Sequence, residues 1–235
     1  MIRINNLSVS FKKTEILHQI NLSVEKGGLI AIAGPNGSGK TTLIKSILGL
    51  VKINSGKIFV NEKDIDHESD YRSKIGFMPQ IARYPDNLTI NEIFSMVKTV
   101  RNHNTKSNEK HLIELFNLEA HVSKYMRNLS GGTRQKVGAV LAFMFNPDIY
   151  ILDEPSVGLD PVSSGIFKNL LLEEKQKGKT IIYISHILNE VDELANRLVF
   201  LIEGRIYLNE EITDFKKIMN EQNLEKAVLN YMQAN

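Results

Sequence analysis

The chain contains no cysteine in its 235 residues. This absence excludes a disulfide framework and thiol chemistry, and it suits a reducing compartment. An excess of charge of one sign is also missing, because 29 basic residues nearly balance 27 acidic ones and leave a formal net charge of +2. So small an excess gives no basic face for nucleic acid, and we expect no nucleic-acid partner.

Long hydrophobic runs are missing as well. The longest stretch without charged or strongly polar residues is Val137–Phe145, whereas a membrane-spanning helix needs about 20 apolar residues. We interpret this stretch as a buried core helix. The first residues, MIRINNLSVSF, lack the apolar segment of a signal peptide. We therefore expect a soluble protein that stays on the side where it is made and meets a membrane only through a partner.

The patterns that are present predict an α/β protein, for which this length allows one large domain or a core with one insertion. Apolar residues alternate with polar ones between Ile2 and Val24, which predicts half-buried antiparallel strands. The continuous apolar run Leu29–Ala33 predicts a strand buried on both faces. A further strand is expected at Lys57–Val60, after a turn at Asn54–Gly56.

Residues 81–129 differ in character from the rest of the chain. The segments LTINEIFSMVKTV and EKHLIELFNLEAHV place apolar residues three or four positions apart, and the polar stretch RNHNTKSNEK separates them. That spacing is typical of amphipathic helices, and the polar stretch is typical of an exposed linker. We therefore predict a helical subdomain inserted at 81–129.

After this insertion the pattern alternates between helices and strands. Helices are expected at 130–145, 162–177 and 188–195, and strands at 149–152, 181–184 and 198–202. Strands and helices that alternate in this way predict a parallel sheet with right-handed crossovers. Residues 1–80 and 130–210 would form the core, and the weakly amphipathic residues 211–235 a helical tail.

One motif predicts nucleotide binding. The segment GPNGSGKT at 34–41 matches the phosphate-binding pattern G-x-x-x-x-G-K-[ST] between a buried strand and a helix. Its backbone N–H groups and the helix start would surround phosphates, Lys40 would bind the β- and γ-phosphates, and Thr41 would bind Mg²⁺. Nucleotide kinases and GTPases share this loop, so the loop alone leaves them open. The expected nucleotide contacts here are Gly34, Pro35, Asn36, Gly37, Ser38, Gly39, Lys40, Thr41 and Thr42.

Four more segments decide among these alternatives. LSGGTRQ at 129–135 precedes a helix, and by itself it is only a flexible helix cap. The strand of IYILDEP ends in Asp153 and Glu154, where one carboxylate can hold Mg²⁺ and the next can polarise an attacking water. SVGLD follows at 156–160, and Ser185-His186 ends a later strand.

Together these segments resemble the ATP-binding cassette (ABC) family, with its P-loop NTPase core, antiparallel β subdomain and helical subdomain. LSGGTRQ is similar to its signature motif, YILDEP to its magnesium-binding strand with the catalytic glutamate, SVGLD to its D-loop, and Met78-Pro79-Gln80 to its Q-loop. Phe11 falls where the family usually has a tyrosine that stacks on adenine, and phenylalanine keeps the π-face. A strand residue in the core remains the alternative for Phe11.

The resemblance implies an ATPase that works with Mg²⁺ as a head-to-tail pair of cassettes, a homodimer in the simplest case. Each ATP would take its phosphate loop, Gln80, Asp153, Glu154 and His186 from one subunit. Ser130, Gly131 and Gly132 would come from the other. Glu154 would be the general base, His186 would stabilise charge at the γ-phosphate, and Gln80 would be the third catalytic residue. Thr41, Gln80 and Asp153 would hold the metal.

The resemblance also implies partners and a location. A transporter motor would bind an integral membrane permease from the cytoplasmic face, whereas soluble relatives act on ribosomes or DNA. LSGGTRQKVGAVLAF and SHILNEVDELANRLVFLIEGRI further resemble the ATPase of the bacterial transporter that serves copper-site maturation of nitrous oxide reductase. Such a system adds a periplasmic accessory protein. A generic multidrug or lipid exporter is the alternative.

Histidines raise the question of a separate metal site. His67, His103, His111 and His121 lie in polar stretches and show no ligand spacing such as H-x-x-x-H. We interpret all four as exposed side chains.

Overall fold

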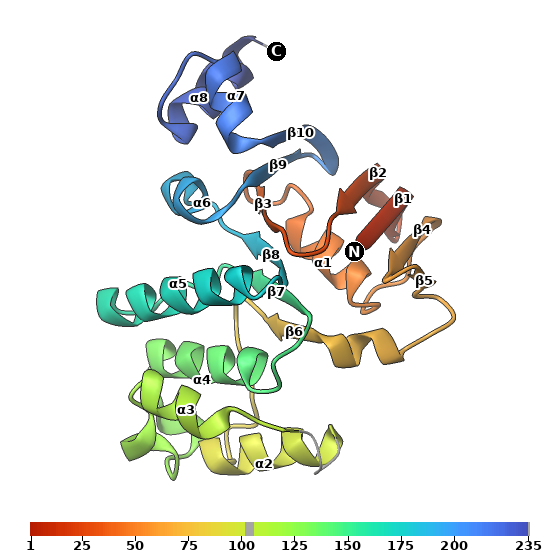
Figure 1. Ribbon diagram of the computed structural model, residues 1–235. Helices are drawn as coiled ribbons and strands as arrows, with labels where there is room; N and C mark the ends of the chain where they lie inside the picture. Colours follow the sequence, from red (N-terminus) through yellow and green to blue (C-terminus); the bar gives the residue numbers. More distant parts are fainter. Residues whose placement is uncertain (102–105, 235) are drawn as a thin grey trace.

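The computed structural model describes residues 1–101 and 106–234, which form two sheets and a set of covering helices (Figure 1). The larger sheet has six strands in the order β10-β9-β3-β8-β7-β6, and the smaller has four in the order β2-β1-β4-β5. The smaller sheet and α1 lie to one side of the larger sheet, and α4 and α5 lie to the other. This is the mixed α/β architecture expected from the sequence.

The smaller sheet is antiparallel, as the alternation near the amino terminus predicts. In its register Ile2 lies opposite both Val24 on β2 and Val60 on β4. These residues are buried, and their neighbours along the strands face outward. The strands are β1 (Ile2–Phe11), β2 (Thr14–Val24), β4 (Ser55–Val60) and β5 (Lys63–Asp64).

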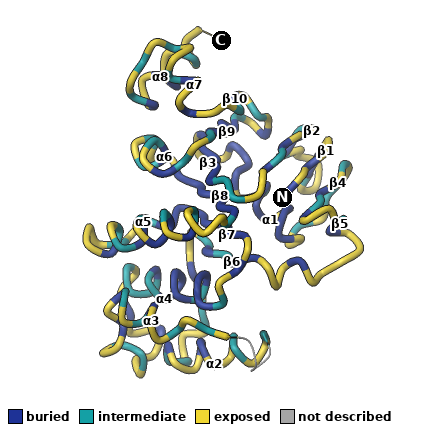
Figure 2. The backbone as a smooth tube through the Cα atoms, viewed as in Figure 1, coloured by how far each residue is buried: buried dark blue, intermediate teal, exposed yellow. Residues whose placement is uncertain are grey.

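The larger sheet is parallel except for its edge strand β10, which pairs antiparallel with β9. Every residue of its three central strands is buried, which explains their continuous apolar sequences. Figure 2 shows this buried centre. The strands are β3 (Leu29–Ala33), β6 (Ile75–Met78), β7 (Ile149–Asp153), β8 (Thr180–Ile184), β9 (Arg197–Ile202) and β10 (Arg205–Glu211).

The helices agree with the expected positions, with one correction. The segment EKHLIELFNLEAHV is not one helix: α3 ends at Leu115, Asn117 adopts a left-handed φ of 52°, and a single 3₁₀ turn follows at Glu119–His121. Asparagine tolerates that conformation better than most residues, which explains the break. The helices are α1 (Lys40–Ile47), α2 (Ile90–Val100), α3 (Glu109–Leu115), α4 (Gly131–Phe143), α5 (Pro161–Gln176), α6 (Leu188–Leu194), α7 (Ile212–Ile218) and α8 (Leu224–Ala234).

Two hydrophobic cores lie on opposite faces of the larger sheet, and alternate residues of one strand belong to different cores. On β7, Ile149 and Ile151 pack toward α1 and the smaller sheet, whereas Tyr150 and Leu152 pack toward α4 and α5. Because both faces are filled, the carboxyl ends of β3, β7 and β8 are fixed in space. The phosphate loop follows β3, Asp153 is the last residue of β7 with Glu154 after it, and His186 follows β8.

The remaining sequence expectations concern histidines and membrane helices. His67 and His111 are exposed as expected, but His121 is partly buried and its Nδ1 atom is enclosed without a hydrogen-bond partner. His103 lies outside the described residues. In residues 1–101 and 106–234 there is no group of three or more potential metal ligands, and no helix long and apolar enough to cross a membrane.

Candidate nucleotide site

The phosphate loop connects the end of β3 to the start of α1, and two of its glycines have no substitute. Gly34 has a φ of 144°, and a Cβ there would lie 2.0 Å from the carbonyl oxygen of Leu201. Gly39 precedes α1 with a φ of 103°, and a Cβ there would lie 2.8 Å from Leu17. A Cβ on Gly34 would strike backbone, and both residues have a positive φ that strains any other amino acid, so the curvature of the loop depends on these glycines.

Lys40 lies inside the curve of this loop. Its ammonium group donates hydrogen bonds to the carbonyl oxygens of Gly34, at 2.8 Å, and Pro35, at 2.9 Å. The residue is buried, and this burial lowers the pKa of Lys40, while the nearby carboxylates of Glu154 and Asp153 act in the opposite direction. The ammonium group of Lys40 is therefore held against the main chain of the loop.

Asp153 is the last residue of β7 and lies beside the first turn of α1. The Thr41 hydroxyl is 3.5 Å from its Oδ2 atom. Burial, and then the charge of Glu154, raise the pKa of the Asp153 carboxyl. A buried carboxylate next to a hydroxyl offers the hard oxygen ligands that Mg²⁺ prefers, and a cation would offset the charge repulsion. Thr41, Asp153 and the side-chain oxygen of Gln80 could therefore hold a magnesium ion.

Glu154 turns away from the strand with a left-handed φ of 49°, and its N–H donates to the carbonyl oxygen of Ile184 on β8. Its carboxylate is held from two sides: His186 Nδ1 lies 3.0 Å from Oε1, and Gln80 Nε2 donates to Oε2 at 3.2 Å. The side chain is only 9% exposed. The three predicted catalytic residues, Glu154, His186 and Gln80, thus meet at one point.

Lys40, Thr41, Gln80, Asp153 and Glu154 line one cavity of about 380 Å³. Gly34, Pro35 and His186 are not among its lining residues, although His186 contacts Glu154. Phe11 lies at the edge of this cavity and is 49% exposed, so the alternative of a core residue is wrong. Ile16, which the sequence reading did not single out, also lines it. An exposed ring beside an aliphatic side chain is a suitable surface for a base to stack on. The lining residues are Phe11, Ile16, Asn36, Gly37, Ser38, Gly39, Lys40, Thr41, Thr42, Gln80, Asp153 and Glu154.

A turn between β9 and β10 connects the phosphate loop to the smaller sheet. Gly204 donates its N–H to the carbonyl oxygen of Ser38 and accepts a hydrogen bond from the His18 N–H, both at 2.9 Å. Its φ is 72°, and a Cβ would lie 2.0 Å from the carbonyl oxygen of Ile16. Phe11 pairs with Thr14 on the same sheet, so backbone contacts link the aromatic edge of the cavity to its phosphate end.

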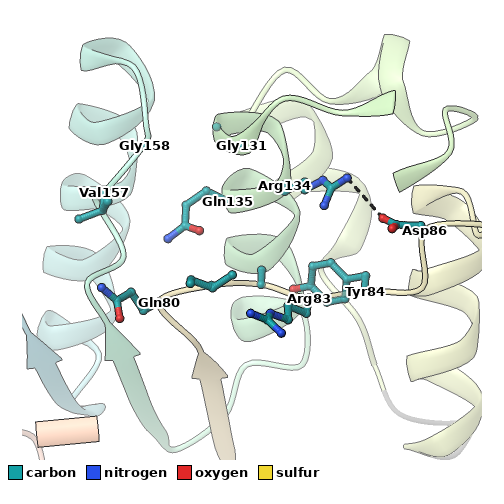
Figure 3. Close-up of a pocket in the computed structure, with 12 residues that line it drawn as sticks. Gln80, Arg83, Tyr84, Asp86, Gly131, Arg134, Gln135, Val157 and Gly158 are labelled. Atoms are coloured by element: carbon teal, nitrogen blue, oxygen red, sulfur yellow. Dashed lines mark hydrogen bonds and ion pairs between the residues drawn. The ribbon is translucent and has the colours of Figure 1, made fainter. Parts of the chain in front are cut away.

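Four residues of the signature segment, Gly131, Gly132, Arg134 and Gln135, line a second cavity. Ser130 precedes α4, and its hydroxyl accepts a hydrogen bond from the Thr133 N–H at 3.2 Å. Gly131 and Gly132 begin the helix and border a cavity of about 600 Å³ that Gln80 also borders. Figure 3 shows Gln80, Gln135 and Val157 reaching this space from three different segments. Within one chain, the phosphate loop and the signature therefore line different cavities.

Residues between Ile81 and Asp86 in the lining of the second cavity carry no sequence signal and meet the signature segment only in the fold. Arg134 and Asp86 form an ion pair at 3.4 Å (Figure 3). Burial raises the pKa of Tyr84 to about 12. The residues missed from the sequence are Ile81, Ala82, Arg83, Tyr84 and Asp86, whereas Arg134, Gln135, Val157 and Gly158 belong to the signature and D-loop segments.

The start of α4 is attached to the segment that follows Glu154. Gln135 Nε2 donates to the carbonyl oxygen of Pro155 at 3.3 Å, and Lys136 lies 3.1 Å from Asp160. A Cβ on Gly132 would lie 2.6 Å from the carbonyl oxygen of Gly158. The signature helix and the D-loop segment therefore pack as one unit.

Comparison with known proteins identifies the family. The family model described as "ABC transporter" matches residues 17–157. The chain belongs to the ABC transporter family of ATPases. A lantibiotic transport ATP-binding protein of Streptococcus pyogenes is 33% identical to this cassette, over 90% of the cassette and 91% of the relative. An ABC transporter A family member of Dictyostelium discoideum is 34% identical over 83% of the cassette, which spans only 24% of that relative.

Solved structures agree with this assignment. The structure of an ATP-binding subunit of an ABC transporter has a TM-score of 0.90 and 26% identity, and the match covers 99% of both chains. A dimeric ATP-binding cassette in a post-hydrolysis state, bound to ADP and Pi, has a TM-score of 0.80 and 25% identity, over 90% of this cassette and 98% of that chain. The cassette fold thus extends over the whole chain, including α7 and α8.

Proposed function

We propose that the cassette hydrolyses Mg-ATP as the motor subunit of a membrane transporter. The observation that carries this proposal is the position of Glu154 between Gln80 and His186, next to the phosphate loop. In this proposal Glu154 takes a proton from the attacking water, and His186 and Lys40 stabilise charge that develops on the γ-phosphate. Phe11 stacks on the base, and residues 34–42 bind the phosphates.

Magnesium has a place in the same proposal. The Thr41 hydroxyl, the Asp153 carboxylate and the Gln80 amide oxygen would hold the ion, which would neutralise charge on the β- and γ-phosphates. The raised pKa of Asp153 supports this placement, because a cation would favour the ionised form that burial opposes.

A second copy of the cassette completes the proposed site. Ser130 and Gly131 are exposed at the start of α4, where a helix start suits an anion, and Gly131 and Gly132 line a different cavity from Lys40. Two copies related by a two-fold axis would bring each signature onto the ATP held by the other copy's loop. The dimeric cassette with ADP and Pi supports this arrangement.

The experiment that tests the proposal measures assembly with ATP. Glu154→Gln protein in Mg-ATP should run as a dimer in light scattering, because ATP remains bound between the copies. Adding Ser130→Arg should return it to a monomer, whereas Ser123→Arg, at another exposed serine, should leave the dimer intact. A dimer that tolerates Ser130→Arg would contradict the shared site.

The permease, the location and the domain boundaries belong to the proposal. We place the cassette on the cytoplasmic face of a membrane through an integral membrane permease, without nucleic acid. We also keep residues 1–80 and 130–210 as the core, 81–129 as the helical subdomain and 211–235 as the tail. Purification of the tagged cassette from detergent-solubilised membranes tests the first point, since recovery of ribosomes in place of a membrane protein would contradict it.

The cargo is the finest level of the proposal. The resemblance of two segments to the ATPase for copper-site maturation of nitrous oxide reductase supports an exporter with a periplasmic accessory protein. The relatives named above carry other cargo names or none, so a generic exporter remains the second candidate. Loss of copper from nitrous oxide reductase in a strain lacking the cassette would support the first; an unchanged copper content would favour the second.

A further inference from the structure

One carboxylate oxygen of Glu190 accepts two hydrogen bonds from segments far apart in the sequence. Glu190 lies on α6, and its Oε2 atom is 2.8 Å from the hydroxyl of Ser156 and 2.8 Å from the hydroxyl of Tyr183. Ser156 opens the D-loop segment, and Tyr183 lies on β8. A single atom therefore connects both segments to the helix behind them.

These two segments carry the residues assigned to hydrolysis. Ser156 comes two residues after Glu154, and Tyr183 comes three residues before His186. The side chains of Glu154 and His186 meet at 3.0 Å. Glu190 lies outside the lining of the nucleotide cavity, so any effect on ATP must pass through these neighbours.

The burial of Tyr183 makes its hydroxyl depend on the Glu190 carboxylate as an acceptor. Tyr183 is fully buried, and this burial, with the charge of Glu190 as the next cause, raises the pKa of its hydroxyl well above the usual range. The hydroxyl therefore remains a donor at neutral pH. A buried donor is costly without an acceptor, so the carboxylate of Glu190 holds Tyr183 and Ser156 at one spacing.

The backbone around Glu154 shows why that spacing matters. Glu154 has a left-handed φ of 49°, its N–H donates to Ile184 on β8, and its carbonyl oxygen accepts from Val157 in the D-loop segment. The direction of its carboxylate thus depends on how the D-loop segment lies relative to β8. On the other side, the Ile187 N–H donates to the Ser185 hydroxyl next to His186.

We propose that Glu190 is a positioning residue for ATP hydrolysis: its carboxylate fixes the spacing between the Glu154 and His186 segments. This inference rests on the proposed roles of Glu154 and His186, and it adds Glu190, a residue of α6 that lies outside the motifs of the family. It assigns Glu190 an effect on turnover and no effect on nucleotide binding.

The first test separates kcat from KM. In Glu190→Ala the acceptor is lost, and we expect kcat for ATP to fall about tenfold while KM stays within about twofold. Glu190→Gln retains an acceptor oxygen and should restore most of kcat. The control is Glu193→Ala. Glu193 lies on α6 like Glu190, but its carboxylate pairs with Lys168 of α5, so the substitution should leave kcat and KM unchanged.

The second test is a double-mutant cycle with His186→Ala. If Glu190 acts through the Glu154–His186 pair, Glu190→Ala should lower the residual rate of His186→Ala by less than about twofold. An undiminished tenfold loss in that background would overturn the proposal, and so would a Glu190→Ala kcat equal to that of Glu193→Ala.

Two smaller substitutions keep the test decisive if Glu190→Ala does not fold. Tyr183→Phe and Ser156→Ala each remove one donor with little change in volume, and each should lower kcat at unchanged KM. Wild-type kcat in both would overturn the proposal. Glu154→Gln in the same assay separates the two hypotheses: an unchanged rate there would contradict the proposed function, whereas a lowered rate with normal Glu190→Ala turnover would contradict only this inference.

Discussion

The phosphate-loop half and the signature half of this cassette differ in how far one chain completes them. Around the loop, Lys40 is buried and bonded to two carbonyl groups, and Glu154 is held from two sides. Around the signature, Ser130 and Gly131 are exposed. A Cβ on Gly34 would strike the backbone at 2.0 Å, whereas one on Gly131 would meet no described atom within 4 Å.

This difference shows which half is complete in one copy. In the loop half, the charged groups of Lys40 and Glu154 and the surrounding backbone are held in place within a single copy of the chain. The signature half presents a helix start toward open space, where a second molecule can approach. The attachment of α4 to the D-loop through Lys136 and Asp160 then gives a route from one half to the other.

The largest effect should come from the loop half. Glu154→Gln removes the proposed base and keeps the size of the side chain, so turnover should fall by about 10²–10⁴. ATP affinity should remain within a few fold, because the phosphate loop is unchanged. Phosphate release and nucleotide titration measure the two quantities, with Glu225→Gln on the exposed face of α8 as the control. Normal turnover would remove Glu154 from the mechanism and leave the fold assignment intact.

A pair of glycine substitutions tests the comparison directly. Gly34→Ala should destabilise the protein by about 3 kcal/mol or more, through a strained φ and a backbone clash. Gly131→Ala should leave the free energy of unfolding within about 1 kcal/mol of wild type. It should nevertheless lower turnover, because the methyl group lies where the other copy's phosphate would approach. Denaturant unfolding and phosphate release give both readouts, and equal stability losses would break the comparison.

Phe11 sharpens the comparison at the base end of the loop half. Phe11→Ala should weaken ATP affinity about tenfold, the upper range for one aromatic stacking contact. Phe11→Tyr keeps the ring and should bind ATP like wild type. The measurement is calorimetry or a fluorescent nucleotide titration with each variant. If Phe11→Ala binds ATP normally, its ring lies outside the nucleotide contact.

The smallest effect concerns the link between the halves. Hydrogen bonds from the Ser163 hydroxyl and N–H, and then Lys136, hold the pKa of the Asp160 carboxyl well below its usual range. A lowered folded-state pKa adds stability that is complete above the ordinary value of about 4 and is lost as pH falls toward the folded value. The Tm of Asp160→Asn should therefore lie below the Tm of wild type at pH 7, and the two values should converge in acid. Asp66→Asn, at another exposed aspartate, serves as the control substitution.

Much of the fold was predictable because its signals are local. The continuous run Leu29–Ala33 and the motif after it are sufficient for a buried strand, a phosphate loop and a helix. Strand β6 was not predicted, because Ile75–Met78 is only four residues long and contains a glycine, so no period can be recognised. Strand β10 was missed for a related reason: it is an edge strand that is mostly exposed.

The site divides in the same way. The sequence pattern predicted Lys40, Asp153 and Glu154, since each lies at or shortly after the end of a strand within a recognisable motif. It gave no sign that Glu190 bonds to Ser156 and Tyr183, because these residues are 34 and 7 positions away and meet only when α6 packs on β8. Contacts that depend on packing between elements leave no spacing in the sequence.

The Gly204 turn affects how the cassette selects a nucleotide by its number of phosphates. Its N–H and carbonyl group link the phosphate loop at Ser38 to the strand of His18, and that strand continues toward the hairpin that carries Phe11. The distance between the Phe11 ring and the phosphate loop is thus set by main-chain hydrogen bonds. Substitutions of the surrounding side chains would leave this distance unchanged. A nucleotide with one phosphate fewer would leave the far end of the phosphate loop unfilled.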